Sequence, residues 1–383
     1  MSQFNEFVSF VRNLYSTSDF LPLHVPIFNG NEKKYILETI ESTFVSSVGA
    51  YVNRIEEIMR AHSSVNRAVA TVNGTTALDM ALKVCGVGQN DEVITQALTF
   101  VATANAISYN GAIPVFVDVD YDTMGLSPKA LLHFLETHAT VENGVCKNKK
   151  TGRRIAACMP MHTFGFMCRI DEIASICDEW SIVLIEDTAE AIGSKYKGRP
   201  SGNFGRVGAF SFNGNKVVTA GGGGMMVTND EKIADLAKHL TTTAKVPHKW
   251  DYFHDQIGYN FRMPNLNAAL LCAQMEQLDK FIINKRETAL EYKSFFDSMG
   301  ITFRMELEDC YANYWLMCIE LDNQRERDEF LAKTNDAGVM TRPIWKLMFD
   351  LPMFKDCYRD SQENASLLSE RIVNIPSSFR PKL

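Results

Sequence analysis

The sequence predicts an α/β protein in which helices flank a mostly parallel, mixed sheet and a smaller α+β domain follows. From about residue 66 onward, short apolar or β-branched runs alternate with stretches of helical periodicity. Such alternation is typical of strand–helix–strand crossovers, which place helices on both faces of a sheet. At Asn265 the pattern changes to Ala- and Leu-rich helical sequence. We therefore expect an N-terminal segment and a large domain over residues 1–264, and a small C-terminal domain over 265–383.

The strands of the large domain are expected where the runs are short and rich in Val, Ile, Ala or Phe. These runs cover residues 67–72, 92–95, 113–118, 155–160, 181–186, 208–212 and 224–228. Helices are expected between the earlier runs, at residues 75–85, 102–109, 127–138 and 169–179. Residues 141–154 are polar and basic, and we expect them to form an exposed turn. In sheets of this kind, ligands bind at the carboxyl ends of the strands.

The two ends of the chain carry further elements. An amphipathic N-terminal helix is expected because apolar residues recur at Phe4, Phe7, Val11 and Leu14. In the small domain, residues 266–293 have helical periodicity, residues 315–321 are strand-like and residues 325–337 are helix-like.

Composition and charge exclude several classes of protein. The 383 residues are 46% hydrophobic and 22% charged, which is typical of a globular protein of about two to three folding units. The net charge of -7 and the lack of a long basic block argue against a duplex nucleic acid partner. No segment is long and apolar enough to span a membrane. Nine cysteines without a C-x-x-C pair or a secretory signal indicate reduced thiols in the cytoplasm.

Common cofactor motifs are absent from the sequence. No G-x-G-x-x-G opens a helix, and no G-x-x-x-x-G-K-[ST] occurs. The eight histidines form no H-E-x-x-H or other closely spaced ligand set, so we expect no metal. Dinucleotide, nucleoside triphosphate and metal chemistry are therefore disfavoured.

Polar segments do follow three of the expected strands. Residues 73–76, AsnGlyThrThr, follow one strand and open a helix, where free N–H groups could hold a phosphate, although Thr is also a common helix cap. Asp187 ends the most apolar strand, where an unpaired carboxylate would be costly. It should face a positive partner, or else cap the next helix.

The third segment contains a lysine among glycines. Lys216 ends the segment SerPheAsnGlyAsnLys that begins at Ser211, and residues 221–224 are all glycine. Glycines allow a ligand and a second backbone to approach closely, and a Lys amine that is partly deprotonated can bond to a carbonyl compound. The alternative is an ordinary solvated lysine.

Further segments occur with these three in one order along the chain. They are ProIlePhe at 26–28, ThrPheValAlaThrAlaAsnAlaIle at 99–107, PheValAspValAsp at 116–120 and GlyTyrAsnPheArgMet at 258–263. Together the segments resemble the sugar-nucleotide aminotransferases of the DegT/DnrJ/EryC1/StrS family, over nearly the whole chain. The resemblance implies the aspartate aminotransferase-like fold, which is fold type I of the pyridoxal phosphate (PLP)-dependent transferases. It also implies that the large domain binds PLP.

The resemblance assigns a role to each candidate site residue. Lys216 would bind PLP covalently and then move the proton as general base and acid. Asp187 would keep the ring nitrogen protonated, and Glu190 would lie near the ring hydroxyl. The other cofactor-binding residues would be Phe100 on the ring face, Gly74, Thr75 and Ser211 at the phosphate, and Asn260 from the neighbouring subunit of a homodimer. Core packing for Phe100 and a turn for Asn260 are the alternatives, and Arg262 is a weaker candidate.

The resemblance also suggests the reaction. Family members transfer an amino group, commonly from glutamate, to a keto group of a nucleotide-linked sugar, whereas dehydrating relatives replace the lysine with histidine. The segments 22–32, 46–52 and 341–348 resemble the subgroup that aminates C4 of UDP-2-acetamido-2,6-dideoxy-hexos-4-ulose in bacillosamine and legionaminic acid pathways. The alternatives are amination at C3, dehydration of another nucleotide sugar, or a PLP- or sugar-sensing regulator. A regulator would usually carry a DNA-binding segment, and none is visible.

Two cationic and aromatic clusters could contact a nucleotide diphosphate. They are formed by Lys245, His248, Lys249, Trp250, Tyr252, Phe253 and His254, and by Arg342, Trp345 and Lys346. An exposed loop with packed aromatic residues is an equally good interpretation of each. His162 follows another expected strand, and a structural role is favoured for it.

Overall fold

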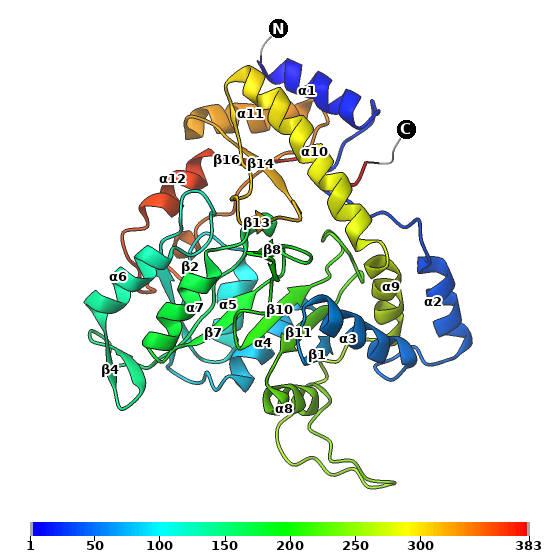
Figure 1. Ribbon diagram of the computed structural model, residues 1–383, viewed down its shortest axis with the longest axis vertical. Coiled ribbons are helices and arrows are strands. Elements are labelled where there is room, and N and C mark those ends of the chain that lie inside the picture. The colour runs from blue at the N-terminus through cyan, green and yellow to red at the C-terminus, as the bar shows by residue number, and fades with distance from the viewer. Residues whose placement is uncertain (1–2, 381–383) are drawn as a thin grey trace.

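A seven-stranded sheet forms the centre of the computed structural model, which describes residues 3–380 (Figure 1). Four neighbouring pairs are parallel, and β11 is antiparallel to both of its neighbours, so the predicted mostly parallel, mixed sheet is confirmed. The spatial order is β1 (Arg67–Thr71), β11 (Gly224–Thr228), β10 (Val207–Ser211), β7 (Val183–Asp187), β6 (Ile155–Cys158), β2 (Glu92–Gln96) and β3 (Ile113–Val117).

Helices cover both faces of this sheet because its strands alternate their apolar side chains between two cores. Val93 packs in the core on one face, and its neighbour Ile94 packs in the core on the other. The first face carries α4 (Gly74–Val84), α5 (Val101–Tyr109) and α8 (Glu231–Thr241). The opposite face carries α6 (Pro128–His138) and α7 (Ile170–Glu179), and α3 (Ala50–His62) and α9 (Asn265–Met275) pack at its other end, near β1 and β11.

The small domain is built on a four-stranded antiparallel sheet. Its strands lie in the order β12 (Thr302–Phe303), β14 (Met317–Glu320), β16 (Ile372–Ile375) and β15 (Arg342–Pro343). The helices around it are α10 (Leu278–Met299), α11 (Gln324–Asp336) and α12 (Glu363–Arg371). The N-terminal helix α1 (Gln3–Leu14) packs on this group, with Phe7 5.6 Å from Phe296 and 5.1 Å from Phe330 between ring centroids. The division of the chain at residue 264 stays a prediction.

Two segments differ from the sequence-based expectation. The helical stretch expected over residues 266–293 is two helices, because α9 ends at Met275 and α10 begins at Leu278 and runs on to Met299. Residues 141–154 are exposed over most of their length, as expected, but the first part of this segment belongs to a hairpin formed by β4 (Ala139–Glu142) and β5 (Val145–Asn148). The side chain of Asn148 is buried and donates to Glu92 Oε2 at 2.8 Å, which ties the hairpin to the sheet.

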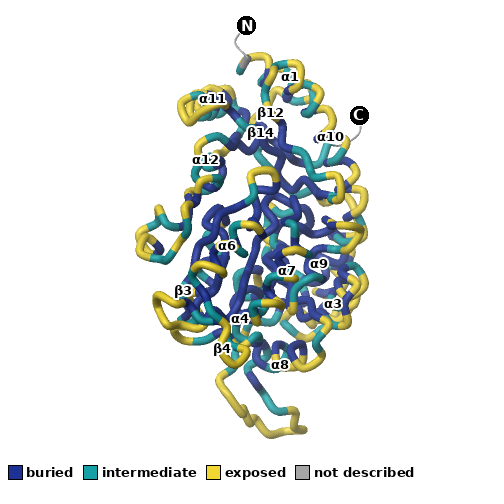
Figure 2. Tube along the Cα trace, turned by 60° about the vertical axis from the view of Figure 1, so that its left-hand side comes forward, coloured by how far each residue is buried: buried dark blue, intermediate teal, exposed yellow. Residues whose placement is uncertain are grey.

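The remaining elements are short or peripheral. They are α2 (Glu32–Glu41), β8 (Lys195–Tyr196), β9 (Arg199–Pro200), β13 (Cys310–Tyr311) and the 3₁₀ turns Thr163–Gly165 and Met348–Asp350. A long exposed loop after α8 extends away from the body of the protein (Figure 2). Within residues 3–380, no helix combines the length and the apolar character that a membrane span requires.

Candidate active site

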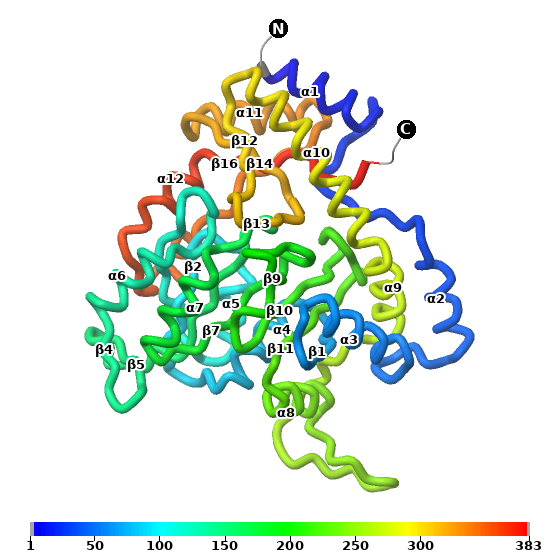
Figure 3. The backbone as a smooth tube through the Cα atoms, viewed as in Figure 1, coloured from blue at the N-terminus to red at the C-terminus, as the bar shows by residue number. Residues whose placement is uncertain are grey.

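A cavity of about 640 Å³ opens where the carboxyl ends of β7 and β10 meet the start of α4 and the small domain. In Figure 3 these two strands lie side by side below the small domain. Every candidate cofactor or catalytic residue except Asn260 lines this one cavity: Gly74, Thr75, Phe100, Asp187, Glu190, Ser211 and Lys216. The strand-end position agrees with the general location of ligand sites in such sheets.

The start of α4 forms a cradle that suits a phosphate. The side chain of Asn73 accepts the N–H of Thr76 at 2.8 Å in a capping box, and Gly74 and Thr75, the first residues of the helix, line the cavity. A Cβ atom on Gly74 would lie 2.5 Å from Ser211 Cβ, so only glycine lets the end of β10 approach the helix start. A Cβ on Gly224 would likewise lie 2.3 Å from Asn73 O. The glycines therefore bring the three candidate phosphate ligands together.

Asp187 is a buried carboxylate held by neutral donors. Thr103 Oγ1 donates to Oδ2 at 2.8 Å, and the N–H of Ala189 donates to Oδ1 at 3.1 Å. Burial raises the pKa of Asp187, and these hydrogen bonds and the charge of Lys216 offset part of that rise. No ion pair of Asp187 is recorded within residues 3–380. A cationic ligand group, such as the protonated ring nitrogen of PLP, would supply the partner that such a carboxylate needs.

Lys216 and Glu190 face each other in the cavity. Lys216 Nζ lies 3.3 Å from Glu190 Oε1, and the N–H of Phe164 donates to Glu190 Oε2 at 2.8 Å. Burial raises the pKa of Glu190 to about 7, although the charge of Lys216 acts in the opposite direction. Near neutral pH this carboxyl can therefore carry a proton, and a protonated carboxyl can donate to an anionic ring oxygen.

Trp315, a residue of the small domain, closes the cavity over Lys216. The ring centroid of Trp315 lies 3.6 Å from Lys216 Nζ, and its indole N–H donates to Asn215 O at 2.6 Å. The sequence predicts only a strand at Trp315, which in the structure precedes β14, and no local motif marks it as a site residue. Thr103, which bonds to Asp187, was also missed, although it lies within the segment 99–107 that carries part of the family resemblance.

Phe100 lies in the cavity, whereas Asn260 lies outside it. Phe100 lines the cavity with 51% of its surface exposed, so it is not an ordinary core residue and is free to contact a ligand. Asn260 is exposed, pairs with Thr242 in a β-bridge and does not line the cavity of its own chain. Its predicted contact with a neighbouring subunit stays a prediction. Arg262 is also outside the cavity, with its guanidinium 4.0 Å from Glu56 Oε1.

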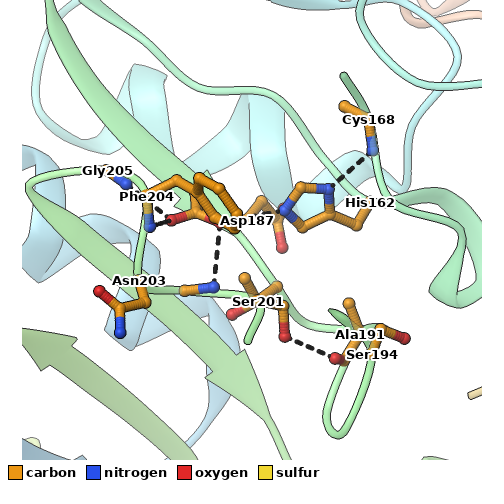
Figure 4. A network of polar contacts seen from close by, with 12 residues as sticks. His162, Cys168, Asp187, Ala191, Ser194, Ser201, Asn203, Phe204 and Gly205 are labelled. Carbon is orange, nitrogen blue, oxygen red and sulfur yellow. Dashed lines mark hydrogen bonds and ion pairs between the residues drawn. The ribbon is translucent and has the colours of Figure 1, made fainter. Parts of the chain in front are cut away.

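His162 belongs to a buried structural network, as favoured from the sequence (Figure 4). The N–H of Cys168 donates to His162 Nδ1 at 3.2 Å, so the proton resides on Nε2, 3.2 Å from Glu186 Oε2. Glu186 also accepts the main-chain N–H groups of Gly202, Phe204 and Gly205 at 2.9, 2.6 and 2.7 Å. This network fixes the loop between β7 and β10, and through it the strand that ends at Asp187.

The two cationic clusters lie in different places. Arg342, Trp345 and Lys346 line the cavity, whereas no residue between Lys245 and His254 does. Within that second cluster, Trp250 and Tyr252 are each 77% exposed and Phe253 is 60% exposed. Only the first cluster can therefore contact a ligand in the cavity of its own chain.

Comparisons of sequence match the chain to known aminotransferases. A profile of the DegT/DnrJ/EryC1/StrS aminotransferase family matches residues 26–381. A GDP-perosamine synthase of Escherichia coli O157:H7 is 37% identical over 358 residues, which cover 94% of this chain and 93% of the relative. A putative pyridoxal phosphate-dependent aminotransferase of Bacillus subtilis (strain 168), EpsN, is 36% identical and covers 91% of this chain and 87% of its own.

Solved structures share the fold. The aminotransferase TlmJ from Streptoalloteichus hindustanus superposes with a TM-score of 0.84 at 24% identity, over 94% of this chain and 93% of its own. A DegT DnrJ EryC1 StrS aminotransferase from Brucella abortus gives a TM-score of 0.82 at 25% identity, over 91% and 90%. The expected fold, with its large sheet and small domain, is thus that of known aminotransferases.

Proposed function

We propose that this chain, which belongs to the DegT/DnrJ/EryC1/StrS aminotransferase family, transfers an amino group from glutamate to the C4 keto group of a nucleotide-linked sugar. Family membership makes the protein a PLP-dependent sugar aminotransferase. The observation that carries the proposal is the single cavity in which Lys216 lies beside Glu190 and Asp187, with the glycine cradle at its far side. PLP, when bound, supplies an aldehyde that links to an amine with loss of water, and a ring that withdraws electrons from the substrate carbon.

The residues of the chain bind the cofactor, move the proton and exclude water. Gly74, Thr75 and Ser211 hold the cofactor phosphate, and Asp187 holds the proton on the ring nitrogen. Lys216 removes a proton from the donor carbon and later delivers one to the sugar carbon. Phe100 contacts one face of the ring. Trp315 and the buried wall around Glu190 exclude water from the Nζ atom of the lysine.

A nucleoside diphosphate-linked acceptor is supported by the charge at the small-domain side of the cavity. Arg342 and Lys346 supply cations for the diphosphate, and Trp345 supplies an aromatic surface beside them. Arg342 is held in place because its Nη1 donates to Asn335 Oδ1 at 3.1 Å and to Thr341 O at 3.0 Å. The acceptor expected from the sequence is UDP-2-acetamido-2,6-dideoxy-hexos-4-ulose. The GDP-perosamine synthase relative makes a GDP-linked 4-keto-6-deoxy sugar the second acceptor to test.

The visible absorption of the PLP-loaded protein tests both half-reactions. We expect a visible band that fades when glutamate is added and returns when the UDP- or GDP-linked 4-keto sugar follows. Product mass and NMR then give the position of the new amine. A band that responds to glutamate and to neither sugar would contradict the proposed acceptors. A band that ignores glutamate would contradict amino transfer from this donor and favour the sensing regulator.

We further propose a homodimer whose two sites each borrow Asn260 from the partner. The proposal is supported by the exposed loop that precedes Asn260, in which Trp250, Tyr252 and Ile257 are between 77% and 85% exposed. A second apolar surface lies on and after α2, where Leu37, Ile40 and Phe44 are more than half exposed. Apolar patches of this kind usually mark interfaces.

Mixing two inactive variants tests the shared site. We expect Lys216→Ala and Asn260→Ala to be nearly inactive as separate homodimers. After denaturation and joint refolding in equal amounts, about a quarter of wild-type activity should return, because each mixed dimer contains one site with both residues intact. Sedimentation velocity should give a dimer in every sample. A dimer without recovered activity would contradict the shared site, and a monomer would contradict the dimer.

A further inference from the structure

A buried lysine outside the cavity is connected to the lysine inside it. Lys285 lies in the middle of α10 with only 1% of its surface exposed, and no ion pair of it is recorded within residues 3–380. Its Nζ donates to two main-chain carbonyls, Trp315 O at 3.2 Å and Ser377 O. Burial lowers the pKa of Lys285 to about 7. A lysine in this position is costly to bury, and a methionine would fill the same space without that cost.

One of the two carbonyls that bond to Lys285 belongs to a residue that contacts Lys216. The carbonyl that accepts from Lys285 belongs to Trp315, whose ring lies 3.6 Å from Lys216 Nζ. The indole N–H of the same residue donates to the carbonyl of Asn215, which directly precedes Lys216 in the chain. Trp315 is thus held by Lys285 at its main chain and contacts both Lys216 and the residue before it with its side chain.

Other hydrogen bonds hold the residues around Trp315, but the carbonyl of Trp315 accepts from Lys285. The N–H of Trp315 donates to Asn313 Oδ1 at 2.8 Å, and Asn313 Nδ2 donates to Glu190 O at 2.8 Å. On the other flank, the N–H of Met317 donates to Ser377 Oγ at 2.8 Å. Lys285 joins these two anchors, because its Nζ bonds both to the segment that carries Trp315 and to the segment that carries Ser377.

The charged and titratable groups near Lys285 do not provide an alternative partner. The titratable neighbour of Lys285 is His24. Burial, together with the charges of Lys285 and Lys216, lowers the pKa of His24 well below its usual value. A neutral imidazole cannot neutralise an ammonium group. The hydrogen bonds to the two carbonyls are therefore the interactions that compensate for burying the Lys285 amine.

We propose that Lys285 is a positioning residue for Lys216 and acts through Trp315. The ring of Trp315 faces the Nζ atom of Lys216, and a π face favours the cationic form of an amine. If Lys285 no longer holds the main chain of Trp315, the ring shifts and Lys216 loses both a wall and this electrostatic support. The inference rests on the proposed role of Lys216 in PLP binding.

The Lys285→Met variant, in the full-length PLP-loaded protein, tests the inference. We expect kcat to fall by about 10- to 100-fold, as for a small misplacement of a catalytic group, with KM for the sugar changed little. The pH midpoint of the visible band should also move down by roughly half a unit, because the cationic form loses the π face. Lys280→Met, at an exposed position of the same helix, is the matched control and should leave both quantities unchanged.

The same substitution made in a Trp315→Leu protein distinguishes a positioning role of Lys285 from a general effect on stability. In Trp315→Leu protein, Lys285→Met should produce no further shift of the midpoint, because the ring is already absent. A midpoint and kcat like those of Lys280→Met, or a full further shift in the Trp315→Leu background, would overturn the inference. Lys285→Gln, which keeps a donor for one carbonyl, replaces the methionine variant if that variant does not fold, and should give a smaller change in the same direction.

Borohydride reduction and peptide mapping distinguish a failure of this inference from a failure of the proposed site. If PLP is fixed on Lys216 and the midpoint does not respond to Lys285→Met, only the positioning role is wrong. If PLP is fixed on another lysine, the proposed role of Lys216 is wrong as well.

Discussion

Replacement of Lys216 by alanine is expected to abolish amino transfer and the visible band of the PLP-loaded protein, while the fold is retained. The reaction loses its general base and acid, which alone is worth about 10²- to 10⁴-fold, and also its covalent attachment point. The fold is retained because the Lys216 side chain contributes to the wall of a cavity and not to the apolar core. Activity assays, visible spectra and a thermal melt measure the three effects.

Lys232→Ala provides the control for this variant, because Lys232 is an exposed lysine at the start of α8. It should keep full activity, the visible band and the melting temperature of the wild type. Borohydride should fix PLP on wild-type protein and on this control, but not on Lys216→Ala. Substantial turnover or covalent fixation in the Lys216 variant would show that another residue is the attachment point.

The central sheet could be predicted because each strand has a local signal. Val93 and Ile94 pack in the cores on opposite faces, and a strand buried on both faces tends to form a short, mostly apolar run. Such runs, separated by helical periodicity, are visible without tertiary information. The strand ends in the structure accordingly agree with the sequence within two or three residues, for example at β1 (Arg67–Thr71) and β11 (Gly224–Thr228).

The break between α9 and α10 lacks a local signal. Apolar residues continue at helical spacing through it, and no Gly or Pro marks the interruption. The nonhelical Gln277 there donates to Glu32 Oε1 at 2.9 Å, a residue at the start of α2. A contact between segments more than two hundred residues apart in the chain cannot be read from helical periodicity. The hairpin over residues 139–148 could not be predicted for a related reason. The hydrogen bond that ties it to the sheet joins Asn148 to Glu92, which is distant in the chain.

Some residues of the candidate site could likewise be predicted from the sequence, and others could not. Asp187 and Lys216 could be proposed because they lie at or shortly after the ends of apolar strands, which meet at one edge of the sheet. The family resemblance added Ser211, the last residue of β10. Trp315 and Lys285 could not, because their contacts depend on how the small domain folds back. The bond from Trp315 to Asn215 joins residues 100 positions apart. Substrate identity is the least predictable part, since it depends on rim residues such as Arg342 and Lys346, whose surroundings are set by tertiary structure.

Replacement of Asp187 by asparagine is expected to lower kcat by about 10²- to 10³-fold while PLP remains bound. Asparagine keeps nearly the same shape: its Oδ1 can accept the N–H of Ala189, and its Nδ2 can donate to the hydroxyl of Thr103, which then accepts instead of donating. It cannot supply the negative charge that keeps the ring nitrogen protonated, so the ring withdraws electrons less well as charge develops on the substrate carbon. Steady-state kinetics and PLP content, measured together, test this separation of binding from chemistry.

A permanently charged cofactor distinguishes a loss of charge from a disturbed site. PLP methylated at the ring nitrogen carries a positive charge that no carboxylate has to maintain, so it should restore much of the rate in Asp187→Asn if the site has room for the methyl group. Thr103→Val is the matched variant, because it removes a hydrogen bond to Asp187 but leaves the carboxyl in place. It should lower kcat far less than Asp187→Asn does. Equal losses in both variants, together with loss of PLP, would instead show that Asp187 matters for the architecture of the cavity and not for its charge.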